Sequence, residues 1–373
     1  MKFSIAQDVF IKALQRAADV AARRTTVPIL THVMLEASAD GTLTLISTDL
    51  EQTLVETCPI QMETPGTTTV PAQLLRDVLT KLQSKDMVQL TLDDNTGRLT
   101  IESRKSVFQL PTLSAVDYPT IQEVSFPCTF TIPSKDFARL INMTAFSMAQ
   151  DETRFYMNGI YMHISEGTEL RAVATDGHRL SKVRIDMPAG SQDMPGVIIS
   201  RKTVNELQGF LKDAGAETPI QISVSPTMIR FQTENLTLLS RLVDGTFPDY
   251  ERVIPTDHSK SLLVQAGEFA QAVDRVALLA RDKTRGIKLF IDKDQIRFAA
   301  DGSDYGMAND AMTVDYQADP INLAFNATYL LDVANALPGD SEAEILMSEE
   351  GRPVMIRQHL NTDALYVIMP MRI

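Results

Sequence analysis

The sequence of 373 residues lacks the motifs by which catalytic and metal-binding sites are most readily recognised. It contains no glycine-rich phosphate loop, no HExxH motif and no CxxC pair. The histidines are scattered without metal-ligand spacing, at His32, His163, His178, His258 and His359. We therefore expect no metal and no cofactor, and no standard catalytic motif is evident.

Cysteine and long apolar runs are equally scarce. The two cysteines, Cys58 and Cys128, lie far apart, which favours two reduced thiols over a disulfide. No apolar run approaches the roughly 18–20 residues that a membrane span needs. Asp8 interrupts the N-terminus before an apolar signal region can form. We expect a cytoplasmic protein that does not contact a membrane.

What the sequence does contain is a threefold repeat. Each copy opens with a helix-like segment: Phe10–Arg16, Phe137–Ile141 and Phe269–Arg275. An apolar strand then ends in an aspartate, at Asp49, Asp176 and Asp301, spaced 127 and 125 residues apart. This period matches a whole domain of about 100–150 residues, whereas solenoid repeats span roughly 20–50. We predict three similar domains, 1–125, 126–257 and 258–373.

Each copy combines strand and helix patterns. Val88 and Leu90 alternate with polar residues before a turn, and Leu99 and Ile101 do so after it, which indicates a hairpin with one buried face. Two segments per copy carry apolar residues at helical spacing instead. The pattern predicts an α+β fold, with antiparallel sheet and two helices in each domain.

Charge is unevenly distributed along the chain. The net charge of −13 would ordinarily argue against nucleic acid. The six predicted helical segments nevertheless carry a net +6 and the remainder −19; these segments are 8–24, 71–82, 134–149, 201–212, 267–285 and 326–337. Helix propensity alone explains this poorly, because Glu favours helices as well as Lys and Arg do but is scarce there.

The segment 175–180 is the one candidate for catalysis, because Asp176 and His178 stand two residues apart after a strand. Catalysis would require a nucleophile such as Ser181 with an oriented base. Asp176 has a counterpart in every copy, however, while the third copy reads Asp301-Gly302-Ser303 and lacks the histidine. A repeated aspartate favours a turn-forming role, and the Gly-His-Arg of the middle copy suggests binding.

Four stretches, in this order, closely resemble the β subunit of bacterial DNA polymerase III, the replication sliding clamp: Asp151–Gly159, Thr175–Leu180, Leu242–Tyr250 and Val367–Arg372. The resemblance runs from Met1 to the last residue. It implies a ring-shaped, head-to-tail homodimer of six domains, with helices inside and sheets outside. It also implies a processivity factor without enzymatic activity, which tethers the replicative polymerase to the DNA that it encircles.

The resemblance implies several partners for the chain: double-stranded DNA, a second copy of the chain, the DNA polymerase III catalytic subunit, the clamp loader, and other clamp-binding polymerases and repair proteins. Contact with DNA through backbone charge alone would be insensitive to base sequence and strongly dependent on salt. A sliding contact needs both properties.

The resemblance also assigns a set of DNA-contacting residues: Arg24, Gln73, Gln150, Arg154, Phe155, Tyr156, Arg201, Lys202 and Tyr329. Arg24 is expected at the end of the first helix. Gln73 stands where some family members carry an arginine, so a phosphate contact there loses its charge. Core packing remains the alternative role for Phe155 and Tyr156.

A second set is assigned to a groove for partner peptides: Met157, Thr175, Gly177, His178, Arg179, Leu180, Pro248, Arg252, Val253, Val367, Met369, Pro370, Met371 and Arg372. Flexible methionines suit a groove that accepts several peptides. Such a peptide would carry Leu, Phe and an acidic or Gln residue. The alternative is that the methionines complete a core and that 367–372 forms the last strand.

A third set is assigned to the dimer interface, where Lys105, Phe108 and Leu110 of one subunit meet Leu278 and Leu279 of the other. Internal core packing is the alternative for these apolar residues.

Two other functions remain open from the residues alone. A DNA-processing enzyme would use Asp176 and His178, but a nuclease should show clustered carboxylates for metal ions. The acid pairs Asp93-Asp94 and Glu349-Glu350 fall in predicted turns. The third possibility is an acidic interaction scaffold that does not contact DNA.

Overall fold

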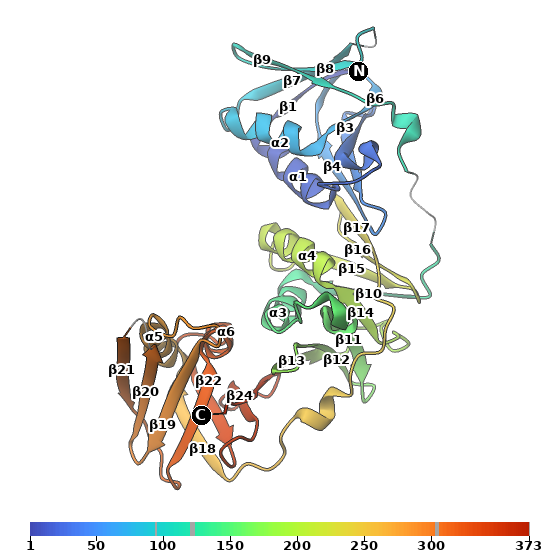
Figure 1. Cartoon of the computed structure of the whole chain (residues 1–373). Coiled ribbons are helices and arrows are strands. Elements are labelled where there is room, and N and C mark those ends of the chain that lie inside the picture. Colours follow the sequence, from blue (N-terminus) through green and yellow to red (C-terminus); the bar gives the residue numbers. More distant parts are fainter. Residues whose placement is uncertain (94, 120–123, 303–305, 373) are drawn as a thin grey trace. The chain divides into compact units, whose positions relative to one another are not determined.

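The computed structural model describes residues 1–93, 95–119, 124–302 and 306–372. Each repeat contains the order β-α-β-β-β twice, with one short extra strand in the first (Figure 1). The first repeat comprises β1 (Lys2–Ala6), α1 (Gln7–Val20), β2 (His32–Ala37), β3 (Thr42–Thr48), β4 (Gln52–Pro59), the extra β5 (Gln61–Thr64), β6 (Gly66–Pro71), α2 (Ala72–Lys81), β7 (Met87–Asp93), β8 (Arg98–Ser103) and β9 (Ser106–Pro111).

The second repeat follows the same order. It comprises β10 (Cys128–Pro133), α3 (Ser134–Ala145), β11 (Gly159–Ser165), β12 (Glu169–Thr175), β13 (Arg179–Asp186), β14 (Val197–Ser200), α4 (Arg201–Asp213), β15 (Pro219–Val224), β16 (Met228–Gln232) and β17 (Leu236–Arg241). The third comprises β18 (Lys260–Gln265), α5 (Ala266–Ala277), β19 (Gly286–Asp292), β20 (Gln295–Gly302), β21 (Gly306–Thr313), β22 (Ile321–Asn326), α6 (Ala327–Ala336), β23 (Glu342–Met347), β24 (Val354–Gln358) and β25 (Ala364–Ile368).

The chain divides into two compact units, and their boundary cuts through the middle repeat. The first unit holds a five-stranded sheet, β5-β1-β7-β8-β9, and an eight-stranded sheet, β10-β15-β16-β17-β4-β3-β2-β6. The second holds an eight-stranded sheet, β14-β11-β12-β13-β25-β24-β23-β18, and a four-stranded sheet, β21-β20-β19-β22. The predicted antiparallel α+β fold is confirmed, with two helices in each repeat.

Strand pairing continues from one repeat into the next. The last strand of the second repeat, β17, pairs with β4 of the first. The last strand of the third repeat, β25, pairs with β13 of the second. Each junction therefore joins the end of one repeat to the fourth strand of the repeat before it. Pairing removes the exposed strand edge that each repeat would otherwise present.

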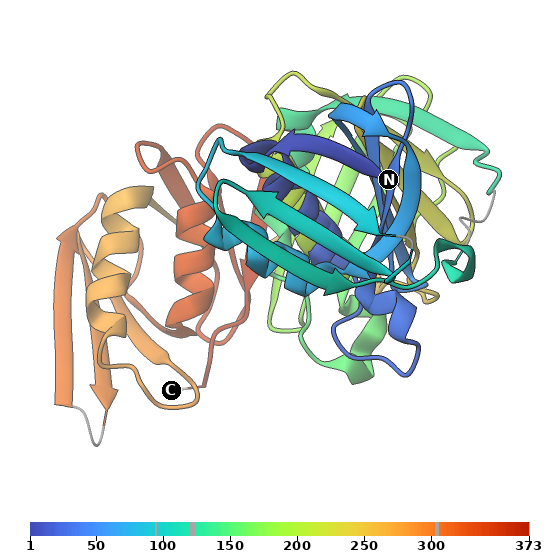
Figure 2. The same cartoon turned by 90° about the horizontal axis from the view of Figure 1, so that it is seen from above.

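The helices bury one face each, as their apolar spacing predicts. In α1, the buried residues Phe10, Ala13, Leu14 and Ala17 recur at three- and four-residue intervals. Phe10 and Leu14 are fully buried, and each such side chain contributes roughly 1.5–3 kcal/mol by leaving water. In Figure 2, α5 and α6 lie side by side, and the two helices are in contact.

Helices α1 and α5 end earlier than predicted, and this changes how much charge they carry. Helix α1 ends at Val20, because the chain then turns and the Ala22 N–H donates to the Leu30 carbonyl. Helix α5 ends at Ala277 in successive tight turns. The six observed helices carry a net charge of only +1 and the rest of the chain −14, so the cationic bias of the helices is smaller than predicted. Much of that positive charge lies in the loops after α1 and α5.

Two further predictions about local structure are confirmed. Strands β7 and β8 form the predicted hairpin, although Asp94 in its turn lies outside the described residues. Cys58 and Cys128 are buried free thiols. Burial is the main cause that raises the pKa of Cys58 to about 12, so this thiol stays protonated and unreactive at neutral pH.

Candidate binding surfaces

The turn between β12 and β13 is built by its own side chains. The Thr175 hydroxyl donates to the Arg179 carbonyl (2.7 Å) and accepts from the Gly177 N–H (3.1 Å). Asp176 Oδ1 accepts from the backbone N–H groups of His178 (2.9 Å) and Arg179 (3.0 Å). The carboxylate of Asp176 thus holds the turn together, which is the predicted structural role.

The Arg179 side chain is buried and ties three parts of the second unit together. Its guanidinium donates to Asp176 Oδ2 (3.1 Å), to Asp332 Oδ2 on α6 (2.6 Å) and to the Phe146 carbonyl after α3. It also lies over the rings of Tyr329 (4.3 Å) and Phe146 (5.5 Å). One side chain therefore connects a predicted groove position with Tyr329, a predicted DNA contact.

The C-terminal segment lies against this turn. Val367 in β25 pairs with Leu180 in β13, and the Met369 N–H donates to the His178 carbonyl (2.9 Å). Strand β25 ends at Ile368, so only the start of the segment 367–372 belongs to the last strand. The Met369 side chain is 43% exposed beyond it. Pro370 and Met371 are half-buried and Arg372 is exposed.

The linker after the second repeat is anchored by aromatic rings. Phe247 stacks on Tyr161 (4.9 Å between centroids), Tyr161 stacks on His163 (4.7 Å), and His163 Nε2 contacts the Tyr250 hydroxyl (2.9 Å). Phe247 and Tyr250 join the buried cluster that contains Val367. Burial lowers the pKa of His163 and is the main cause that raises the pKa of Tyr250 to about 12.

The other predicted groove residues differ in exposure. Arg252 is almost fully exposed and pairs with Asp249 (2.6 Å), and Val253 is half exposed. Pro248 is half-buried, and Met157, at the end of a short 3-10 helix (Glu152–Met157), is buried. The turn 175–180 and the C-terminal segment are therefore in direct contact, while the linker residues Arg252 and Val253 lie at the surface.

Among the predicted DNA contacts, Arg24, Gln150 and Phe155 are exposed. Arg24 lies in the loop after α1 rather than on the helix. Lys202, at the start of α4, is half-buried. Tyr156 is half-buried against the aromatic cluster of the linker, which agrees with the packing alternative for this residue.

The remaining members of that set are engaged within the chain. The Gln73 amide donates to the Ala18 carbonyl, joining α2 to α1. Arg154 donates to the Asp176 carbonyl (3.0 Å). Arg201 donates to the carbonyl of Met148 (3.0 Å), and burial lowers its pKa.

The predicted dimer residues lie near two edge strands. Lys105 is exposed in the turn before β9, Phe108 is half-buried, and Leu110 is buried within its own subunit. Leu278 is 61% exposed just after α5, and Leu279 is half-buried. The edge strands β9 and β21 also expose Val107 (58%) and Met307 (73%), which were not predicted from the sequence. The available signal was a large apolar residue on the same strand face as a polar one, Val107 beside Gln109 and Met307 beside Asn309.

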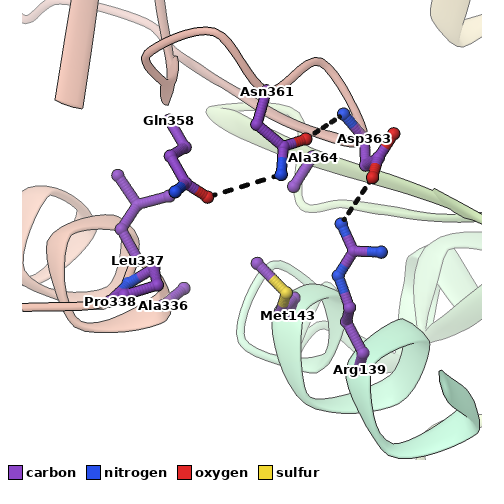
Figure 3. A pocket seen from close by; sticks show the side chains of 9 residues that line it. All are labelled: Arg139, Met143, Ala336, Leu337, Pro338, Gln358, Asn361, Asp363 and Ala364. Carbon is purple, nitrogen blue, oxygen red and sulfur yellow. Dashed lines mark hydrogen bonds and ion pairs between the residues drawn. The ribbon is translucent and has the colours of Figure 1, made fainter. Parts of the chain in front are cut away.

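A separate cavity of about 630 Å³ lies between α3, the end of α6 and the chain joining β24 to β25 (Figure 3). It is lined by Arg139, Met143, Ala336, Leu337, Pro338, Gln358, Asn361, Asp363 and Ala364. None of these residues belongs to the predicted DNA, groove or dimer sets.

Comparison with models of known protein families identifies the family of this chain. The N-terminal, central and C-terminal domains of the DNA polymerase III β subunit match residues 1–122, 131–249 and 251–372. The chain belongs to this family. It is a sliding clamp, a processivity factor with no catalytic activity of its own.

Full-length relatives agree with the family models. The β sliding clamp of Caulobacter vibrioides is 37% identical over 376 residues, and that of Escherichia coli (strain K12) is 36% identical over 376 residues; the alignments cover 100% of each chain. The crystal structure of the sliding clamp from Bartonella birtlesii bound to griselimycin has a TM-score of 0.93 at 38% identity. The Pseudomonas aeruginosa clamp bound to griselimycin has a TM-score of 0.91 at 34% identity. Both solved structures align over 100% of each chain.

Three further observations bear on possible functions. In the described ranges, no group of three or more His, Cys, Asp or Glu side chains is arranged to hold a metal ion. Glu349 and Glu350 lie in the turn between β23 and β24, as predicted. In the same ranges, no helix is long and apolar enough to cross a membrane.

Asp332 and Phe146, beside the turn 175–180, were also not predicted from the sequence. Each contacts Arg179, but Asp332 lies 153 residues from it in the chain. Neither residue stands out by type or spacing, so no signal in the sequence marks the contact.

Proposed function

We propose that two copies of this chain close head to tail into a ring of six domains around duplex DNA. The pattern of strand pairing between consecutive repeats is the observation that supports this proposal. Strand β17 pairs with β4, and β25 pairs with β13, so the last strand of a repeat meets the fourth strand of the repeat before it. Applied once more, this rule pairs β9 with β21. Both are edge strands within one chain, so a second copy supplies the partner.

Exposed apolar side chains support this pairing. Val107 on β9 and Met307 on β21 face solvent in the single chain, and Leu278 is exposed after α5. We further propose the domain boundaries 1–125, 126–257 and 258–373, each domain holding two β-α-β-β-β units.

The DNA contact is proposed to be independent of base sequence. Arg24 is exposed, and the loops after α1 and α5 are cationic in an acidic protein. Phosphate contacts from such side chains carry no base information, so the ring can slide. Replication takes place beside the chromosome, which supports a cytoplasmic location.

Partner peptides are proposed to bind beside the turn 175–180 and the C-terminal segment. Exposed Met369 and Val253 offer apolar contact, and Arg252 offers an accessible charge. The partners are the DNA polymerase III catalytic subunit, the clamp loader, and other polymerases and repair proteins. Griselimycin bound to two related clamps supports a ligand-binding surface in this family.

A topological experiment tests the ring. The clamp is loaded on nicked circular DNA, and its retention is measured by gel filtration before and after the DNA is linearised. We expect retention on the circle, loss from the linear form without any other cleavage, and a mass of two chains by ultracentrifugation. Equal loss from circular and linear DNA would exclude encirclement, and cutting of the DNA would favour the enzyme instead.

Deletion of residues 369–373 tests the peptide surface. We expect the dimer mass to be unchanged while affinity for a polymerase-derived peptide is lost. An intact dimer with unchanged affinity would place the peptide elsewhere.

A further inference from the structure

The cavity between α3 and α6 has the size and composition of a ligand site. Its volume of about 630 Å³ falls within the roughly 300–1,000 Å³ typical of small-molecule pockets. Helix α3 supplies Arg139 and Met143, which are one turn apart and share a helix face. The end of α6 supplies the opposite wall at Leu337 (Figure 3).

This cavity is distinct from the proposed peptide surface. The turn 175–180 reaches α3 and α6 through Arg179, at Phe146 and Asp332. None of the residues that line the cavity belongs to that surface. The lining residues nearest to those contacts in the chain are Met143, three residues from Phe146, and Ala336, four residues from Asp332.

The charged end of the cavity offers spare hydrogen-bond donors. Arg139 contacts Asp363 Oδ2 and the Arg184 carbonyl, both at 3.4 Å. Arg184 Nε lies 3.3 Å from the other oxygen of Asp363, so two guanidinium groups share one carboxylate. Charge-assisted hydrogen bonds are normally shorter, at about 2.7–2.9 Å. A guanidinium has five N–H donors, so Arg139 can bind a further carboxylate through two of them.

The rest of the lining suits an apolar group with an amide beside it. Met143 lies between Arg139 and Leu337, and Ala364 adds a further apolar surface (Figure 3). The side-chain amides of Gln358 and Asn361 contact each other at 3.5 Å, a long hydrogen bond that a ligand amide can replace.

We propose that this cavity binds the C-terminal residue of a peptide chain, with its free carboxylate on Arg139 and an apolar side chain between Met143 and Leu337. The amide of that residue bonds to Gln358 or Asn361. This site does not depend on the ring or on the peptide surface proposed above.

Methionine methyl NMR of the full chain tests the site directly. Acetyl-alanyl-leucine is titrated as the free acid and, as a matched neutral probe, as its C-terminal amide. The Met143 methyl reports on the cavity, and the Met369 methyl reports on the peptide surface. We expect the acid to shift the Met143 signal with a Kd about tenfold lower than that of the amide, since a charged hydrogen bond is lost in the amide. The Met369 signal should not move.

Two substitutions give opposite results if the site is correct. Arg139→Gln should weaken binding of the acid about tenfold. Asp363→Asn should tighten it, because the competing carboxylate is removed. Arg297→Gln, a distant change of the same kind on β20, should leave the Kd unchanged. Melting curves check that each variant is folded.

Three outcomes would overturn the proposal. These are an unmoved Met143 signal up to the solubility limit of the acid, equal affinities for acid and amide, and weaker binding in Asp363→Asn. If Arg139→Gln does not fold, the acid-amide comparison and Asp363→Asn decide the matter.

Discussion

Two turns at equivalent places in the first and second repeats have the same hydrogen bonds from Thr and Asp side chains and from the backbone. Thr48 donates to the Gln52 carbonyl (2.7 Å), as Thr175 does to that of Arg179 (2.7 Å). Asp49 accepts from two backbone N–H groups, as Asp176 does. The Arg241 N–H donates to the Glu51 carbonyl (2.9 Å), as the Met369 N–H donates to that of His178 (2.9 Å).

The turns differ in the side chains that follow the aspartate. The first turn has Leu50 with a positive φ of 77°, whereas the second has Gly177 with a φ of 87°. The second also has Arg179, whose guanidinium reaches α6. Thr and Asp therefore preserve the backbone of the repeat, while the residues between and after them give the second junction its own contacts.

Replacing Arg179 should produce the largest difference in stability between variants of the two turns. Arg179→Ala leaves Asp332 and the Phe146 carbonyl without this partner, and breaking a buried ion pair in this way costs about 3 kcal/mol. Gln52→Ala, at the equivalent position, truncates a buried but uncharged side chain and should cost about 1 kcal/mol. Denaturant unfolding measures both, with peptide affinity lost only in Arg179→Ala. Equal losses of stability would show that Arg179 has no special role at its junction.

Substitutions at the two residues with positive φ should change stability in opposite directions. Gly177→Ala should destabilise by about 1–2 kcal/mol, because alanine is strained at this φ. Its Cβ would also lie 3.1 Å from Arg154 Nη1. Leu50→Gly should instead stabilise by about 0.5 kcal/mol, because it relieves strain at the cost of a more flexible unfolded chain. Thermal melting distinguishes the signs, and destabilisation by both changes would contradict the strain at Leu50.

Replacing each aspartate by asparagine should separate turn formation from ion pairing. The amide oxygen of asparagine still accepts the turn hydrogen bonds, so Asp49→Asn should be nearly neutral. Asp176→Asn should cost about 1–2 kcal/mol, because Arg179 loses a charged acceptor. Unfolding midpoints at constant m-value provide the measurement. A cost for Asp49→Asn as large as that for Asp176→Asn would assign both effects to the turn alone.

We expect the smallest effect from replacing two histidines, which should alter how the stability depends on pH. Burial lowers the pKa of His32 in the first repeat and of His163 in the second, so the folded chain favours the neutral rings. The unfolded chain protonates first, near pH 6.5. The stability is therefore fully present above about pH 6.5 and is lost as the pH falls through that value toward the lower folded pKa values. His32→Gln and His163→Gln should each flatten the decline in melting temperature between pH 7 and 5; an unchanged profile would mean that the rings do not titrate in this range.

The threefold repeat, the strand and helix pattern and the turn-forming aspartates can all be predicted from the sequence. Local periodicity predicts them, because the spacing of apolar residues indicates which side chains face the core. The ends of α1 and α5 cannot be predicted in this way. The turns after Val20 and Ala277 remove cations from the helices, and this decides how much charge each helix carries.

Tertiary packing brings together distant parts of the chain that the sequence does not link. It joined β17 to β4 and β25 to β13, buried Leu110 within its own subunit, and paired Arg179 with Asp332 across 153 residues. Such contacts depend on where whole strands and helices pack in space. An aspartate on a helix carries the same letter whether it faces water or a buried guanidinium.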